Sequence, residues 1–249
     1  MAGELIRAVK ESLGEEPKIM AAGRTDAGVH ALGQVANFYT RSSQPVMELR
    51  ELLNDALPKD VAILRIDDVA PSFHARHSAK ERIYLYRIST RRSAFLKELA
   101  WWVKSRLDTE SITAAGRLLV GRRDFSNFAD KATIPEDPVL TLFDIRVDRD
   151  GTLIDIRFRA ERFLPRMVRR ITGVLVAVAQ GRMPVASVPN LFTTPLPEVA
   201  AWTAPPSGLF LEAVLYDERE AAAPAYRGGK GGEKQDPGGI LVWRPGELP

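Results

Sequence analysis

The stretch AGRTDAGVHA, residues 22–31, is the most informative part of this chain. It places Asp26 two positions after Arg24 in a loop framed by glycines, directly after a predicted strand over 18–22. Glycine lets a backbone turn tightly or approach a ligand closely. Asp26 is therefore either a turn residue paired with Arg24, a common arrangement, or a carboxylate presented to a ligand. The lysine and glycine spacing does not fit a phosphate-binding loop.

Apolar periodicity on both sides of this loop predicts an α+β protein with two similar lobes. Spacing of 3.6 residues predicts helices over 4–13, 46–57, 108–120 and 165–180. Alternation predicts strands over 33–39, 61–69, 82–89, 139–147, 152–159 and 208–216, and the turn at 148–151 predicts a hairpin between two of them.

We expect three parts along the chain. Residues 1–105 form an N-terminal lobe that holds the loop, residues 106–217 form a C-terminal lobe, and residues 218–249 form a disordered tail. The tail prediction rests on 221–239, which is rich in Ala, Gly, Pro and Lys and lacks periodicity. The apolar run at 240–243 could pack on the rest, at a place that the sequence does not reveal.

Composition excludes several classes of protein. The 249 residues are 45% hydrophobic and 27% charged, as in a globular domain, with no apolar run long enough for a membrane span. The absence of cysteine excludes disulfides, thiolate metal sites and cysteine nucleophiles, and favours a cytoplasmic setting. Net charge is only +3, but 157–182 holds seven arginines against one glutamate, which is either a path for a phosphate backbone or a solvated basic face.

Residues 23–31 resemble the signature of the TruA family of tRNA pseudouridine synthases. Other elements of that family follow in order over residues 3–217: FHAR at 73–76, RIYLY at 82–86, DFSNF at 124–128, the helix FLPRMVRRITG at 163–173 and PPSGLFL at 205–211. An ordered set of this kind is highly specific. The resemblance implies two lobes of antiparallel sheet, each with helices on one side, and an active-site cleft between them.

The same resemblance implies an activity and its residues. The chain would isomerise uridine to pseudouridine at positions 38, 39 and 40 of the tRNA anticodon stem-loop, as a homodimer without a cofactor. Asp26 would be the catalytic carboxylate, Arg169 its ion-pair partner and Tyr84 the ring that stacks on the flipped-out uracil. The residues that would bind RNA are Arg24, His30, Phe73, Arg76, Arg166 and Arg170.

The residues themselves leave alternatives open. On the helix over 165–180, Arg166, Arg169 and Gly173 lie opposite the apolar face, so Arg169 faces either solvent or a cleft, and Gly173 permits close approach of a backbone or of RNA. Tyr84 is either a half-buried strand aromatic or a stacking platform. The three histidines lack a recognisable metal-ligand spacing, so we expect no metal. Whether the carboxylate would attack the sugar or the base is open.

One departure from the family favours a rival function. The chain starts at the helix that follows the family's first strand, so we expect an open edge on the neighbouring strand and a truncated or mis-started gene product. The main alternative is therefore a catalytically weak or inactive RNA-binding protein of the same fold. A methyltransferase or thiolating enzyme is disfavoured because the chain has no Gly-rich cofactor motif and no cysteine.

Overall fold

The computed structural model describes residues 2–194, 196–217 and 238–242, which form two compact units. Unit 1 contains the described residues within Met1–Arg24, Leu32–Lys80 and Ala213–Pro249, and unit 2 those within Thr25–Ala31 and Glu81–Glu212. This division differs from the predicted boundary at residue 105. The predicted disorder of 218–237 and 243–249 lies outside the described residues.

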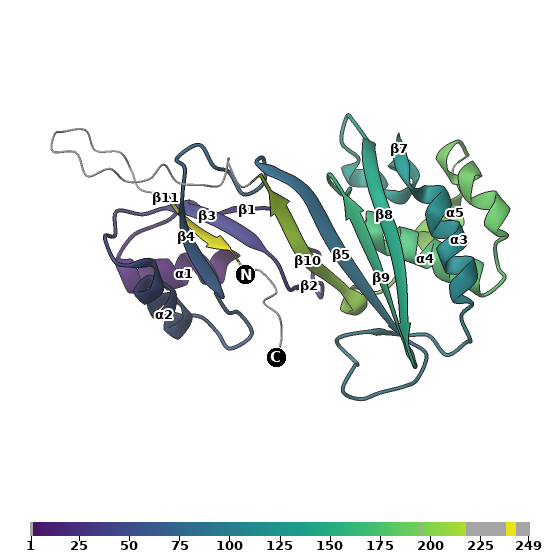
Figure 1. The fold of residues 1–249 in the computed structure, drawn as a ribbon, viewed down its shortest axis with the longest axis horizontal. Helices are drawn as coiled ribbons and strands as arrows, with labels where there is room; N and C mark the ends of the chain where they lie inside the picture. The colour runs from purple at the N-terminus through teal and green to yellow at the C-terminus, as the bar shows by residue number, and fades with distance from the viewer. Residues whose placement is uncertain (1, 195, 218–237, 243–249) are drawn as a thin grey trace. The chain divides into compact units, whose positions relative to one another are not determined.

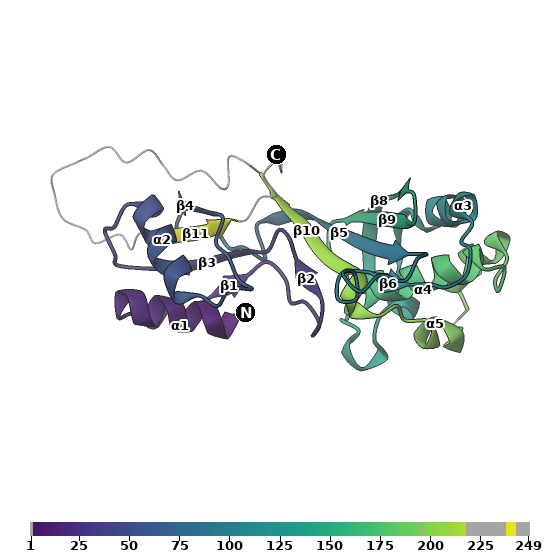
Figure 2. The same ribbon diagram turned by 90° about the horizontal axis from the view of Figure 1, so that it is seen from below.

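Unit 1 is a four-stranded sheet covered by two helices (Figure 2). The helices are α1 (Ala2–Leu13) and α2 (Val46–Ala56), and α2 ends before Pro58 because the residue preceding proline disfavours helical backbone. Ala8 and Val9 of α1 and Leu49 and Leu53 of α2 pack with Phe38 in one buried core. The strands are β1 (Met20–Ala21), β3 (Val35–Tyr39), β4 (Arg65–Val69) and β11 (Gly238–Val242).

Strand β11 joins β3 to β4 within unit 1. It pairs antiparallel with both, with Ile240 opposite Asn37 on one side and Asp67 on the other. The structure therefore differs from the predicted tail at Gly238–Val242, which forms a strand. Strand β3 has β1 on one side and β11 on the other, and β1 and β4 are the outer strands of this sheet.

Unit 2 is built on a seven-stranded sheet with the order β2–β10–β5–β9–β8–β7, and β6 pairs with β5. Strands β8 (Val139–Asp150) and β9 (Leu153–Ala160) form the predicted hairpin, with Gly151 at a positive φ of 54° in its turn. The remaining strands are β2 (His30–Ala31), β5 (Ala79–Ser89), β6 (Trp101–Trp102), β7 (Gly121–Asp124) and β10 (Leu209–Tyr216).

Three helices pack together on one side of the β8–β9 hairpin (Figure 1). They are α3 (Thr109–Leu119), α4 (Met167–Ala179) and α5 (Pro197–Ala201). The Asp108 carboxylate caps α3 by accepting from the backbone N–H of Glu110 at 3.1 Å, as its position before the helix predicts. None of the described helices combines the length and the apolar character that crossing a bilayer requires. The α+β class expected from the sequence is confirmed.

Two pairings explain why unit 2 takes residues from the predicted N-terminal lobe. Strand β5 is antiparallel to β9 over eight residue pairs, Arg82–Ala160 to Ser89–Leu153, so residues 82–89 fold with the second half of the chain. The short strand β2 is parallel to β10, with His30 opposite Phe210. The loop that holds Asp26 therefore belongs to unit 2.

Candidate active site

Asp26 lies at a tight turn that leads into β2. The carbonyl of Asp26 accepts from the N–H of Val29 at 3.1 Å, and Gly28 has a φ of 78°, which favours glycine. A Cβ on Gly28 would also lie 3.1 Å from the side chain of Pro206. The turn leaves the Asp26 side chain 40% exposed. A carboxylate in this position is available to a ligand.

The partner of Asp26 is Arg169 on α4. Nη1 of Arg169 donates to Oδ2 of Asp26 at 2.7 Å, and the Arg169 side chain is only 15% exposed. The ion pair expected from the family resemblance is thus present, and the alternative of a solvent-facing Arg169 is wrong. Because Asp26 is partly exposed, solvent screens the pair to on the order of 1 kcal/mol. Its main consequence is therefore the placement of the two groups rather than stability.

The backbone of Ala204 holds the guanidinium from the other side. Nε of Arg169 donates to the carbonyl of Ala204 at 2.8 Å, and the N–H of Ala204 donates to the carbonyl of Arg169 at 3.1 Å. These reciprocal bonds join α4 to the segment that follows α5. Arg169 is consequently fixed between a loop backbone and the Asp26 carboxylate.

Tyr84 on β5 lies in the electrostatic field of the same carboxylate. Its half-buried ring packs edge-on against Phe163, with centroids 5.0 Å apart. Burial raises the pKa of Tyr84 to about 12, Arg82 lowers it, and the nearby Asp26 raises it. At neutral pH Tyr84 is therefore a neutral phenol, and the site combines a carboxylate, a guanidinium and an aromatic ring.

Gly173 lies where α4 meets the segment after α5. A Cβ at this position would overlap the carbonyl oxygen of Trp202 and lie 2.7 Å from the Trp202 carbonyl carbon. The sequence left open whether Gly173 permits the close approach of a backbone or of RNA. In the structure its close neighbour is the backbone of Trp202. The bare face of Gly173 lets this segment approach α4 closely enough for Ala204 to bond Arg169.

Gly173→Ala is expected to destabilise the protein by about 1–3 kcal/mol, because overpacking forces backbone shifts of this cost. Urea unfolding followed by circular dichroism measures the change. Gly3→Ala in α1 is the matched control, since a Cβ there meets nothing within 4 Å and alanine favours a helix. Equal unfolding midpoints for the two variants would contradict the close packing.

The two other arginines of this region have different surroundings. Arg166 precedes α4 with a left-handed backbone, φ 63°, and its exposed side chain pairs with Asp130 at 3.2 Å. Arg170 is 6% exposed and donates to the carbonyl of Ala129, and burial lowers its pKa. Direct contact of Arg170 with RNA is not supported by this placement, because the side chain faces the core.

The remaining predicted RNA-binding residues are divided between the two units. His30 follows the turn, where its ring stacks on Phe210 and its Nε2–H donates to the carbonyl of Glu98 at 2.6 Å. Arg24, Phe73 and Arg76 belong to unit 1. Phe73 is buried against Tyr216, whereas Arg24 and Arg76 are exposed. Their contact with RNA stays a prediction.

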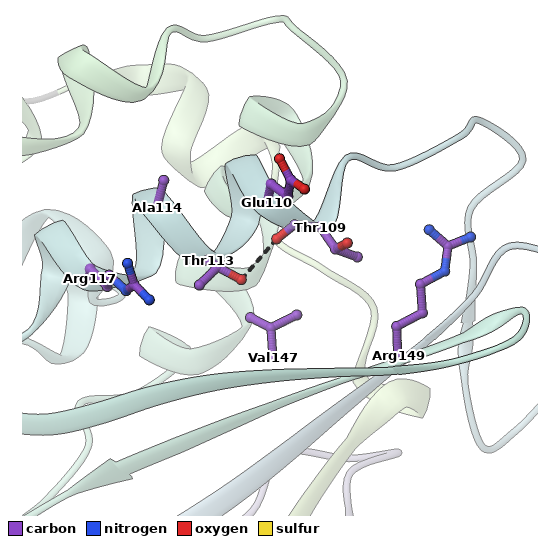
Figure 3. A pocket seen from close by; sticks show the side chains of 7 residues that line it. All are labelled: Thr109, Glu110, Thr113, Ala114, Arg117, Val147 and Arg149. Atoms are coloured by element: carbon purple, nitrogen blue, oxygen red, sulfur yellow. Dashed lines mark hydrogen bonds between the residues drawn. The ribbon is translucent and has the colours of Figure 1, made fainter.

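A separate hollow of about 330 Å³ lies between α3 and β8 (Figure 3). It shares no lining residue with the cluster of Asp26, Tyr84 and Arg169. Arg117 and Arg149 stand at its two ends and Val147 forms its floor, with the remaining lining from Thr109, Glu110, Thr113 and Ala114. Among the residues that the structure describes, no group of three or more His, Asp or Glu side chains is placed to hold a metal ion.

Sequence reasoning did not single out Tyr86, Ala204 and Pro205, which surround the Arg169 contact. Tyr86 had a signal, since it ends the RIYLY element and lies on the same strand face as Tyr84. Pro205 begins the PPSGLFL element, but Ala204 had no signal, and both act through backbone carbonyls that any residue type carries.

Comparison with known proteins agrees with the motifs. A family model described as tRNA pseudouridine synthase matches residues 4–78 and 115–217, which include Asp26 and Arg169 but not Tyr84. A protein named tRNA pseudouridine synthase A from Geobacillus sp. (strain WCH70) is 38% identical over 218 residues, 86% of this chain and 88% of the relative. The protein of the same name from Paraburkholderia xenovorans (strain LB400) is 38% identical over 91% of this chain and 84% of the relative. That from Thermoanaerobacter sp. (strain X514) is 36% identical over 85% of this chain and 88% of the relative.

Proposed function

Because this chain belongs to the tRNA pseudouridine synthase family, we propose that it isomerises uridine to pseudouridine in the anticodon stem-loop of tRNA with Asp26 as the reacting carboxylate. The target positions proposed are 38, 39 and 40. We further propose a homodimer as the active form. Both refinements rest on the resemblance to TruA enzymes.

The ion pair between Asp26 and Arg169 is the observation that carries the proposal. A surface that only binds RNA needs cations, because cationic side chains displace the counterions of the phosphates into solvent, and a carboxylate works against such binding. Here the carboxylate is 40% exposed and held at 2.7 Å by a guanidinium that is itself mostly buried. This arrangement keeps a negative charge in place at a site for an anionic polymer, which suits chemistry better than binding.

The reaction needs no atom from outside the substrate except exchange of a proton. The bond between C1′ of the ribose and N1 of uracil breaks, the base rotates, and a bond forms between C1′ and C5. The proton on C5 leaves, and N1 gains one. A carboxylate can attack to form a covalent intermediate, or stabilise the positive charge that develops at C1′. Asp26 is proposed for this step, and the reaction written in this way calls for no cofactor.

Tyr84 is proposed as the surface on which the uracil stacks. Extrusion of a base costs a few kcal/mol, and stacking on an aromatic ring returns about 1–3 kcal/mol per base. With a pKa of about 12, the phenol enters the reaction with its proton on. The first role of Tyr84 is therefore that of a flat ring beside the carboxylate. Tyr84 could take the C5 proton only after binding of the uracil had changed the surroundings of the phenol.

Mapping of the product tests the proposed substrate. After incubation with an unmodified tRNA transcript that has uridines at 38, 39 and 40, carbodiimide treatment and primer extension are expected to report pseudouridine at those positions. A transcript with cytidines there is the matched control and is expected to give no stops. Pseudouridine confined to other arms of the tRNA would contradict the anticodon assignment while leaving the isomerase activity intact.

The rival function, a weak or inactive RNA-binding protein of the same fold, predicts a different pattern. A protein that only binds RNA would retain its affinity for tRNA and yield no pseudouridine at any position. This comparison is made under conditions where light scattering shows that the protein is a homodimer. A strictly monomeric sample with full activity would contradict the homodimer and nothing else.

A further inference from the structure

The position of the Arg169 guanidinium depends on the segment Trp202–Gly208, which connects α5 to β10. Ala204 supplies the carbonyl that accepts from Nε of Arg169 at 2.8 Å. Pro206, two residues later, lies against Gly28 in the turn that holds Asp26. One short segment thus contacts both Arg169 and the turn that holds Asp26.

Two consecutive prolines limit how this segment can hold itself in place. Pro205 and Pro206 have no backbone N–H to donate, so after the N–H of Ala204, which donates to the carbonyl of Arg169, carbonyl groups and side-chain packing anchor the segment. The carbonyl of Pro205 accepts a hydrogen bond from the hydroxyl of Tyr86 at 2.7 Å. That carbonyl directly follows Ala204 in the chain, so the bond acts one residue away from the Arg169 contact.

Tyr86 is a rigid anchor. It is 0% exposed and pairs with Ile156 in the middle of the β5–β9 ladder. A Cβ on Gly208 would lie 2.6 Å from the carbonyl oxygen of Arg87 and 2.9 Å from the Tyr86 ring, so the far end of the segment rests on the same strand. Burial raises the pKa of Tyr86, and nearby Arg169 lowers it by a smaller amount, so the hydroxyl keeps the proton that it donates.

We propose that Tyr86 is a positioning residue for pseudouridine formation: its hydroxyl holds the Pro205 carbonyl, which keeps Ala204 and hence the Arg169 guanidinium in register with Asp26. This inference deepens the proposed function and rests on it. Tyr86 does not contact the reacting nucleotide in this scheme and acts through Arg169 alone.

The kinetic test is a double-mutant cycle of Tyr86→Phe with Arg169→Leu, read as the single-turnover rate of pseudouridine formation and as tRNA affinity. Tyr86→Phe is expected to lower the rate about tenfold or more in the wild-type background, since small displacements at a reacting site cost up to 10²-fold. In the Arg169→Leu background it should lower the rate less than twofold, with affinity unchanged in both. Equal rate losses in the two backgrounds, or no loss in an active wild type, would overturn the proposal.

A second measurement needs no activity and so separates this inference from the proposed function. The Nε–H signal of Arg169, identified in an arginine side-chain NMR spectrum by its loss in Arg169→Lys, is expected to exchange slowly with solvent. Tyr86→Phe should speed that exchange at least about tenfold if the Ala204 bond loosens, a change equal to about 1.4 kcal/mol. Unchanged exchange would overturn the proposal even if the protein makes no pseudouridine.

Tyr39→Phe is the matched control for both measurements. The hydroxyl of Tyr39 also donates to a proline carbonyl, that of Pro71 at 2.9 Å, and both residues lie in unit 1. This variant is expected to leave the rate and the Arg169 exchange unchanged. An effect as large as that of Tyr86→Phe would mean that loss of any such bond suffices, and would also overturn the proposal.

Discussion

Asp26→Asn is expected to lower pseudouridine formation by about 10³-fold or more while tRNA affinity stays the same or rises. Loss of a group that acts directly on the reacting atoms has effects of this size or larger. Affinity should not fall, because the substitution removes a negative charge from the proposed binding site of an anionic RNA. Nucleoside analysis by mass spectrometry measures the product, and filter binding measures the affinity.

Asp155→Asn is the matched control for this substitution. Asp155 is also a carboxylate of unit 2 in an ion pair, with Arg87 at 2.8 Å, and its side chain is 18% exposed. It is expected to keep its rate and to lose stability. If Asp26→Asn kept more than a tenth of the wild-type rate, Asp26 would be a turn residue, as its sequence context alone also allows.

Arg169→Leu is expected to lower the single-turnover rate by roughly 10²-fold with little change in tRNA affinity. The substitution leaves Asp26 without its 2.7 Å partner and the Ala204 carbonyl without its donor. An unmet buried acceptor costs about 1–3 kcal/mol, so the free energy of unfolding should fall as well. The rate loss must therefore be measured at a temperature where the variant is folded.

Arg87→Leu separates the two effects of the Arg169 substitution. The Arg87 side chain is 32% exposed and forms two hydrogen bonds with Asp155, so its loss should destabilise unit 2 to a similar extent. It is expected to leave the rate unchanged. Losses of rate and tRNA affinity in equal measure for Arg169→Leu would contradict its role beside Asp26 and make it an RNA contact.

Helices and strands could be predicted from the sequence where the pattern that specifies them lies within the element itself. Alternating apolar residues and a glycine turn predicted the β8–β9 hairpin, and helical spacing with Asp108 at the start predicted α3. The strands β2 and β6 are only two residues long and exist because β10 and β5 lie beside them. Strand β11 escaped prediction for the same reason: its short apolar run follows a Gly- and Pro-rich stretch, and its partners are distant in the chain.

The site was predictable only in part, because its contacts join residues far apart in the chain. The helical pattern placed Arg169 opposite the apolar face, but only the family resemblance supplied its partner, which is 143 residues away. The adjacent Arg170 lies one residue further round the helix, where its side chain is buried, and its contact with RNA stays a prediction. The backbone carbonyls that position Arg169 leave no trace in residue types.

Release of tritium from tRNA labelled at C5 of uracil tests the central proposal most directly, since that hydrogen leaves when C5 bonds to the ribose. The wild-type protein is expected to release one tritium for each uridine converted, and Asp26→Ala to release none above background. No release from the folded wild type, or equal release from the two proteins, would contradict the assignment of this chemistry to Asp26.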